Sequence, residues 1–487
     1  MYACESMADG SAVSRAICLC HRPEVGRLTR LINADLSRRG FVAGVAASVA
    51  ALGLPFGAGA QPAQATQARP IVLTNFRLFD GKGATLRDGL HLVVEGDRIK
   101  SVGSGAPPAP EGAQTISCGG RVIMPGMIDA HWHSLFAALP LQVLLQGNMG
   151  FIHVAASGEA QRTLLRGFTT VRDLGGPAFA FKLAIDQGLT PGPRIYPSGA
   201  MITGSGGHGD LRPLSDVPRI PGGALSFTEQ TGAAAIVDSP DEIRLRVREQ
   251  LTQGASQIKL VGGGGVSSPR SPLDLTTLSE AELRAGVEVA KDWNTYATVH
   301  AYAPQTVQRA IAAGARCVEH AHLMDETTAK MMADKGVWLS IQPFLSEEDT
   351  GQLTGPNRVA ALQVFAGTDN AYRLARKYKI RTAWGSDMLF NPALALRQGT
   401  MLTHLTKWYS NAEILTMATS TNAELLALSG PRNPYPGRLG VIEEGAYADL
   451  LLVDGNPLEN IALLANPDSS LLIVMKDGRI HKNALKS

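Results

Sequence analysis

Cysteine is scarce in this sequence. Five cysteines occur in 487 residues, and three of them (Cys4, Cys18 and Cys20) lie close to the N-terminus. The two others, Cys118 and Cys317, cannot form the framework of bridges that stabilises small secreted domains. The fold must therefore depend on a hydrophobic core, which the chain length and a hydrophobic content of 45% allow.

The sequence also lacks an excess of charge of either sign. Lysine and arginine number 45 and aspartate and glutamate 43, so the formal net charge is +2. No clustered basic face marks a nucleic-acid binder, and no strong field would draw the chain to an anionic membrane. We expect a small-molecule or peptide ligand and no nucleic-acid partner.

Residues 1–60 have the features of an export signal. Arg38 and Arg39 form a twin-arginine pattern, and residues 42–56 are an uncharged apolar run too short for a confident membrane span. Small residues follow at 58–60, as at a cleavage site, with 63–65 as a second choice. We expect export of the folded protein to a bacterial periplasm with the signal removed and no stable membrane insertion, a retained anchor being the alternative.

The two ends of the remaining chain are rich in short β-strands. Residues 71–75 and 92–95 near one end, and 448–453 and 471–475 near the other, are apolar runs bounded by turn residues. Residues 69–124 and 433–487 are therefore predicted to form one small β-sandwich built from both termini.

Apolar strands alternate with helical stretches through residues 125–432. Helical runs such as 279–294 and 303–313 separate eight strand candidates, at 122–129, 168–173, 194–198, 257–261, 296–301, 317–320, 337–342 and 381–386. This pattern predicts an α/β fold, a (β/α)₈ TIM barrel. A doubly wound open sheet is the alternative, but no G-x-G-x-x-G opening follows the first strand.

Polar residues recur at the carboxyl ends of these strands, where barrel enzymes place their active sites. His131 and His133 are two residues apart, so in an extended strand they face the same side and can share one metal ion. Taken alone, the pair is as often a coincidence as a metal site.

Lys259 lies within an apolar strand, where burial favours the neutral amine. A neutral amine can take up carbon dioxide and become a carbamate that bridges two cations. Taken alone, an exposed lysine at the edge of the strand is the simpler interpretation.

Three further strands end in candidate ligands, namely His300, His320 and Asp387. Each histidine by itself fits a structural role, and Asp387 by itself fits a helix N-cap. Together with His131, His133 and Lys259, they place candidate metal ligands at strands one, four, five, six and eight of the expected barrel.

In this arrangement the chain resembles the amidohydrolase superfamily, in the branch of imidazolonepropionase-like sequences, metal-dependent Xaa-Pro dipeptidases and ochratoxin amidases. The resemblance covers nearly the whole chain after the signal. The matching motifs are residues 125–133, residues 167–173, the strand ends at His300, His320 and Asp387, and residues 445–450 with 453–457.

The resemblance implies a site with two divalent metal ions. His131, His133 and Asp387 would hold one ion, His300 and His320 the other, and Lys259 as N6-carboxylysine would bridge them. Zinc is the expected metal, because imidazole and oxygen ligands suit it. A water or hydroxide between the ions would be the nucleophile, and Asp387 would transfer its proton to the leaving amine.

The resemblance carries less information about the substrate. His208, in a Gly-Gly-His-Gly loop, would contact the developing oxyanion, and Tyr302 would contact a terminal carboxylate. A flexible loop with an incidental histidine is the alternative for His208. Glycine-rich segments at 211–238 and 263–274 are candidate lids.

We therefore expect hydrolysis of dipeptides or N-acyl amino acids with a free carboxylate, ochratoxin-type amides included. Cyclic-amide ring opening of the imidazolonepropionase type is the alternative. A deaminase is disfavoured because deaminases of this superfamily generally lack a lysine at the position of Lys259. A non-catalytic scaffold is disfavoured because none of the six candidate ligands is missing. The resemblance also implies a homo-oligomer.

Overall fold

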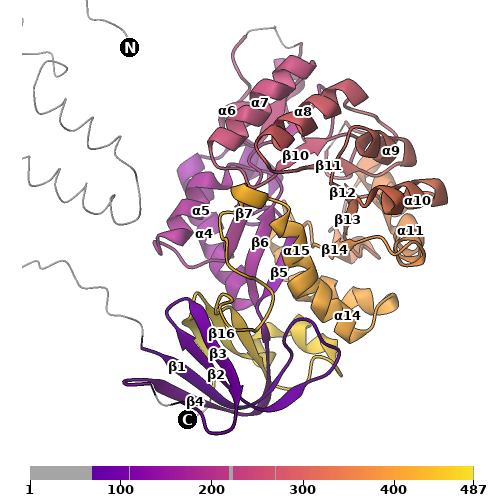
Figure 1. The fold of residues 1–487 in the computed structure, drawn as a ribbon. Helices are drawn as coiled ribbons and strands as arrows, with labels where there is room; N and C mark the ends of the chain where they lie inside the picture. Colours follow the sequence, from indigo (N-terminus) through magenta and orange to yellow (C-terminus); the bar gives the residue numbers. More distant parts are fainter. Residues whose placement is uncertain (1–68, 109, 219–222, 269, 486–487) are drawn as a thin grey trace, which may run out of the picture. The chain divides into compact units, whose positions relative to one another are not determined.

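A computed structural model describes residues 69–108, 110–218, 223–268 and 270–485 of the chain (Figure 1). The expected export signal at residues 1–60 lies outside these residues. Among those described, Cys118 and Cys317 are both buried and free. No helix of the described part is both long and apolar enough to cross a membrane.

Strands from both ends of the described chain form one seven-stranded sheet (Figure 1). In spatial order these strands are β17 (Arg479–Asn483), β16 (Leu471–Lys476), β15 (Leu450–Val453), β4 (Gln114–Pro125), β1 (Ile71–Leu78), β2 (Arg87–Glu95) and β3 (Arg98–Ser104). The long strand β4 pairs in parallel with β1 and antiparallel with β15, so it joins the two ends of the sequence.

This sheet folds around a hydrophobic core of its own. Leu92 and Ile99 near one edge belong to the same buried cluster as Leu450 and Ile473 near the other. Within β4 the register with β1 shifts at a pair of glycines, residues 119–120, both with positive φ. Such a bulge bends the strand, which brings the two edges toward a common core.

Eight parallel strands close into a barrel, as expected. They are β5 (Met127–Trp132), β6 (Phe168–Asp173), β7 (Arg194–Pro197), β10 (Ile258–Val261), β11 (Ala297–Ala301), β12 (Cys317–His320), β13 (Trp338–Ile341) and β14 (Thr382–Trp384). Pairing runs from β5 to β7 and from β10 to β14. Two backbone hydrogen bonds join these groups, from Asp387 to His131 (2.8 Å) and from Ser256 to Pro197 (2.8 Å).

Two further short strands continue the sheet on the side of β10 away from β11. β8 (Met201–Thr203) pairs with β10, and β9 (Ala234–Ile236) pairs with β8. Neither was expected from the sequence, because three residues are too few to show an alternating pattern.

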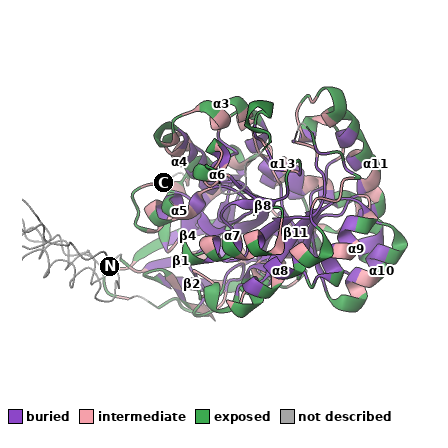
Figure 2. Ribbon diagram, turned by 90° about the horizontal axis from the view of Figure 1, so that it is seen from above, coloured by how far each residue is buried: buried purple, intermediate pink, exposed green. Residues whose placement is uncertain are grey.

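Helices follow most barrel strands and cover the ring (Figure 2). The longer ones are α4 (Met149–Leu165), α5 (Ala178–Asp186), α7 (Pro240–Thr252), α8 (Glu280–Asp292), α9 (Pro304–Ala312), α10 (Glu326–Lys335) and α11 (Gly355–Lys377). The shorter ones are α3 (Leu141–Gln146), α6 (Phe227–Gln230), α12 (Pro392–Ala395), α13 (Gln398–Thr403), α14 (Asn411–Thr416), α15 (Asn422–Ala427) and α16 (Pro467–Ser470).

Helix α8 shows how the sequence sets these boundaries. Ser279 and Glu282 form a capping box at its start, and Leu283, Gly286 and Val289 lie on its buried face. The helical runs expected at 279–294 and 303–313 thus appear as α8 and α9, each shorter than expected by one to two residues at its ends.

The first barrel strand begins later than expected. Residues 122–125 belong to β4 of the terminal sheet, and β5 begins only at Met127. A Cβ on Gly126, between the two strands, would lie 2.2 Å from Oγ1 of Thr169. The chain therefore passes from one sheet to the other through a close approach to β6 that only glycine permits.

Candidate active site

His131 and His133 at the end of β5 point toward one carboxylate oxygen. Their Nε2 atoms lie 3.2 and 3.1 Å from Oδ1 of Asp387, which follows β14. Ligands bonded at about 2.0–2.1 Å to one tetrahedral ion lie about 3.3 Å apart, so these three atoms fit a common metal ion. One ligand atom each of His131, His320 and Asp387 also lie within 4.8 Å of one another.

His300 of β11 and His320 of β12 form a second pair, with ring centroids 4.4 Å apart. Nε2 of His300 lies 2.9 Å from the carbonyl of Gly264, and Nδ1 of His320 lies 2.7 Å from Oε1 of Gln342. Both oxygens accept hydrogen bonds, so Nδ1 of His300 and Nε2 of His320 remain available as ligand atoms. Burial lowers the pKa of both histidines well below the usual value, which favours the neutral, ligating form.

Each histidine of the first pair also has an acceptor behind it. Nδ1 of His131 lies 2.8 Å from Oε2 of Glu319, and Nδ1 of His133 lies 3.3 Å from the carbonyl of Gly175. Glu319 is fully buried and pairs with the guanidinium of Arg172 at 2.7 Å. Burial alone would raise its carboxyl pKa, but Arg172 and His131 hold that pKa well below the usual value.

Sequence reasoning missed these supporting groups. Arg172 of β6 pairs with Glu319 of β12. Asp173 accepts hydrogen bonds from the backbone of Ser134 (2.7 Å) and Gly175 (3.2 Å). The one available signal was that Glu319 is a charged residue within an apolar strand beside a candidate ligand.

Lys259 lies in β10 with 2% of its surface exposed. Burial lowers the pKa of its amine to about 8, although the carboxylates of Glu319 and Asp387 oppose this shift. The neutral amine, which a carbamate requires, is therefore more accessible than in an ordinary lysine. The alternative of an exposed lysine at the strand edge is wrong.

The backbone is strained at two of the candidate ligands. His320 and Asp387 have φ values of 77° and 52°, in the left-handed region that side chains disfavour. At Asp387 a buried carboxylate maintains the turn, because Asp129 accepts hydrogen bonds from the backbone of Ser386 (3.0 Å) and of His131 (3.0 Å). Asp129 thus joins the ends of the first and last barrel strands, where such strain often accompanies function.

His208 and Tyr302 pack against the second histidine pair. The ring of His208 stacks on His300, with centroids 4.3 Å apart, and that of Tyr302 stacks on His320 at 4.6 Å. Burial lowers the pKa of His208 to about 4, so its ring is neutral at pH 7. A Cβ on Gly265 would lie 2.2 Å from this ring, so glycine is needed there.

The structure thus brings all eight predicted site residues together at the carboxyl ends of the barrel strands. These residues are His131, His133, His208, Lys259, His300, Tyr302, His320 and Asp387. The imidazoles of the two histidine pairs, the carboxylate of Asp387 and the buried amine of Lys259 form a donor set. Such a set suits two divalent cations that prefer imidazole and oxygen ligands. The individual ligand roles remain predictions.

The sequence model of the amidohydrolase family matches residues 122–481. Ochratoxinase of Aspergillus niger is 30% identical over 443 residues, which cover 86% of this chain and 88% of that protein.

Two solved structures share the fold and cover 85% of this chain and 100% of their own. A prolidase complexed with N-methylphosphonate-L-proline is 32% identical with a TM-score of 0.77. A Xaa-Pro dipeptidase with bound methionine is 25% identical with a TM-score of 0.73. With its barrel and this match along most of its length, the chain belongs to the amidohydrolase family of hydrolases.

Proposed function

We propose that this amidohydrolase uses two divalent metal ions to cleave the amide bond of dipeptides or N-acyl amino acids that carry a free carboxylate. The observation that carries the proposal is the approach of two imidazole nitrogens, from His131 and His133, to one oxygen of Asp387. Lys259, His300 and His320 beside them supply the ligands for a second ion.

In this proposal His131, His133 and Asp387 hold one ion, His300 and His320 hold the other, and Lys259 as a carbamate contacts both. Zinc is the metal we propose, since imidazole and oxygen donors suit it. Such ions, when bound, lower the pKa of water and polarise a carbonyl. The chain holds the histidine rings in position through the acceptors behind them.

Asp387 is the group that moves the proton. One of its oxygens faces His131 and His133, and the other lies 3.9 Å from Nδ1 of His320. Burial opposes its charged form, but the neighbouring histidines hold its pKa well below the usual value, so it is ionised at pH 7. It can accept a proton from the attacking water and deliver that proton to the leaving amine.

His208 and Tyr302 are the groups we assign to the substrate. His208 is neutral and has a buried Nδ1 without a hydrogen-bond partner among the described residues, so its ring can direct an N–H at the developing oxyanion. Tyr302 stacks on His320 and can donate its hydroxyl to a carboxylate. The printed names ochratoxinase, prolidase and Xaa-Pro dipeptidase support an amide whose leaving group is an amino acid.

The first experiment is a substrate panel with the zinc-loaded protein. N-acyl amino acids and dipeptides are compared as free acids and as C-terminal amides, together with cyclic amides. Hydrolysis of the free acids alone is expected. Equal rates on acids and amides would refute the carboxylate contact, and activity on cyclic amides alone would favour ring opening of the imidazolonepropionase type.

We also propose that the twin-arginine segment exports the folded protein to the periplasm and that the protein self-associates. Replacing Arg38 and Arg39 by lysine should retain the protein in the cytoplasm, which fractionation would measure. Periplasmic recovery of that variant would refute the export route. Light scattering measures the oligomeric state, and a monomer would refute self-association.

A further inference from the structure

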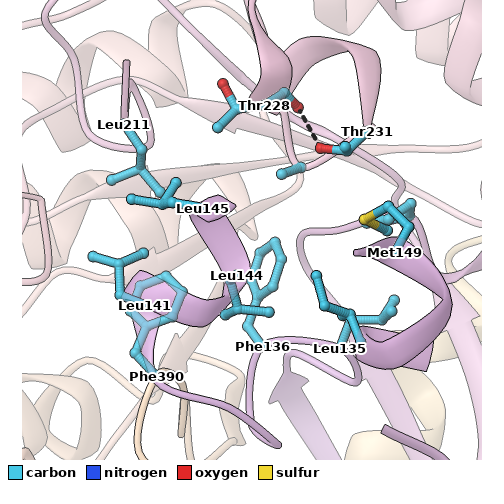
Figure 3. Close-up of a pocket in the computed structure, with 13 residues that line it drawn as sticks. Leu135, Phe136, Leu141, Leu144, Leu145, Met149, Leu211, Thr228, Thr231 and Phe390 are labelled. Carbon is cyan, nitrogen blue, oxygen red and sulfur yellow. Dashed lines mark hydrogen bonds between the residues drawn. The ribbon is translucent and has the colours of Figure 1, made fainter. Parts of the chain in front are cut away.

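An apolar pocket of about 420 Å³, including the open space at its mouth, has Phe136 in its wall, and the ring of Phe136 stacks on the candidate ligand His133. Figure 3 shows the residues that line the pocket. Its wall has no charged side chain: it consists of leucines, phenylalanines and other apolar residues with two threonines. One threonine hydroxyl, that of Thr231, donates within α6 to the carbonyl of Thr228 at 3.3 Å. An occupant therefore contacts an essentially apolar surface.

The wall is continuous with the site. Three pocket residues each follow a candidate site residue by three positions: Phe136 follows His133, Leu211 follows His208 and Phe390 follows Asp387. The ring of Phe136 stacks on His133 with centroids 5.8 Å apart and lies 5.7 Å from that of Phe390. The backbone of Phe390 donates to the carbonyl of Phe136 at 2.8 Å, so the segments after the first and last barrel strands form one wall.

Helix α3 also lines the pocket, and it contacts the hydrophobic core only through the partly buried Leu144. Its sequence contains three leucines, Leu141, Leu144 and Leu145, all of which line the pocket, yet none of its residues is buried. Figure 3 shows these leucines around the same space as Phe136 and Phe390. Leucines left partly exposed beside a catalytic centre would gain from an apolar occupant, at roughly 25 cal/mol per Å² covered.

Successive ring contacts connect the pocket to the proposed carboxylate contact. Phe136 contacts His133, His133 lies 5.4 Å from His131, His131 lies 5.0 Å from His320, and His320 contacts Tyr302. A substrate whose carboxylate is at Tyr302 and whose amide lies over the ligands therefore directs its acyl part toward Phe136.

We infer that this pocket binds the acyl group of the substrate and selects amides whose acyl part carries an aromatic ring or a branched aliphatic chain. The inference rests on the proposed function and adds to it the acyl preference.

The test holds the leaving group constant as L-alanine and varies the acyl group. Wild-type protein should hydrolyse N-(3-phenylpropanoyl)-L-alanine with a kcat/KM at least about tenfold above that for N-acetyl-L-alanine, the scale on which apolar pockets discriminate. Leu144→Trp fills the pocket and should abolish this preference, with the acetyl substrate affected less than about twofold. The control Gln142→Trp adds the same ring to an exposed position of α3 outside the pocket and should keep the preference.

A binding measurement separates this inference from the proposed function. Isothermal titration calorimetry should detect 3-phenylpropanoate binding to wild type and Gln142→Trp but not to Leu144→Trp, with circular dichroism confirming that all three are folded. Inactivity of wild type on every amide would refute the proposed function. Amide hydrolysis with no acyl preference, or with equal losses in both tryptophan variants, would refute the pocket alone, as would a preference for N-acetyl-L-phenylalanine, which places the leaving group there.

Discussion

At the scale of single residues, the site depends on charges that are buried but paired. Glu319 has no exposed surface, yet it is held between Arg172 and the ring of His131. This arrangement fixes the tautomer of His131 and directs its Nε2 toward Asp387. Carboxylates behind metal-binding histidines generally increase the basicity of the ligand.

Substituting Glu319 by glutamine should weaken metal binding by about 10–100-fold, the usual effect of removing such a supporting group. The amide preserves the shape of the side chain but removes the negative charge between Arg172 and His131. Competition with a chelator of known affinity measures the change. Glu326→Gln, on the surface of α10, is the control. Equal affinities in both variants would mean that Glu319 has only a packing role.

Substituting Lys259 by alanine should lower the bound metal content and reduce kcat by about 10²-fold or more, the scale on which one electrostatic group acts in an active site. The variant lacks the amine that would become the bridging anion. Elemental analysis and turnover are the measurements, and Lys335→Ala at the exposed end of α10 is the control. Unchanged metal content and turnover would contradict the bridging role.

At the scale of elements, glycines position the loops over the barrel mouth. Gly265 follows β10 and leaves room for the ring of His208. Gly265→Ala should therefore displace His208 and lower kcat by about tenfold or more, while the melting temperature changes little, since the clash is with one side chain of a loop. Gly158→Ala, within α4, is the matched control and should stabilise by about 1 kcal/mol. A fully active Gly265→Ala would exclude His208 from catalysis.

The sequence predicted the barrel strands and the candidate ligands better than it predicted the residues that contact those ligands. Short apolar segments between turns predicted all eight barrel strands, and the two-residue spacing placed His131 and His133 on one face. The passage from β4 to β5 was not predictable, because residues 122–128 carry no charged or hydrogen-bonding side chain although they belong to two sheets. Nor were Glu319 and Gln342, because their contacts with His131 and His320 exist only once the barrel has closed.

At the scale of the whole molecule, many buried histidines make stability dependent on pH. Burial lowers the pKa of His208 and His322 to about 4 and that of His300 and His320 well below 6.5. As pH falls below about 6.5, the unfolded chain therefore takes up protons that the folded protein does not, and stability is lost down to the folded pKa. His131, whose pKa is raised, opposes this trend.

The melting temperature of the metal-free protein should accordingly fall between pH 7 and pH 5. A histidine with a folded pKa of about 4 contributes up to about 3 kcal/mol over its full range. Scanning calorimetry at a series of pH values measures the slope. His322→Gln, which removes one such histidine, should flatten it. A melting temperature that stays constant or rises toward pH 5 would contradict the assignment of these histidines as neutral.

Buried ion pairs also connect the terminal sheet to the barrel. Arg194 of β7 is buried and pairs with Asp449, just before β15, and with Asp477, just after β16. The motif at residues 445–450 noted in the sequence therefore supplies a carboxylate that connects the last part of the chain to a barrel strand. Because breaking a buried pair costs about 3–5 kcal/mol, the two parts should unfold together.

The position of β4 has a consequence for how the protein is made. This strand leads directly into β5, which carries His131 and His133, and it is flanked by β1 on one side and β15 on the other. A ribosome delivers β1 long before β5 but β15 only near the end of translation. The base of the ligand-bearing strand therefore lacks one neighbour until the polypeptide is almost finished. For the two ions of the proposed function, loading would then follow synthesis and, on the export route proposed above, would be completed before the protein leaves the cytoplasm.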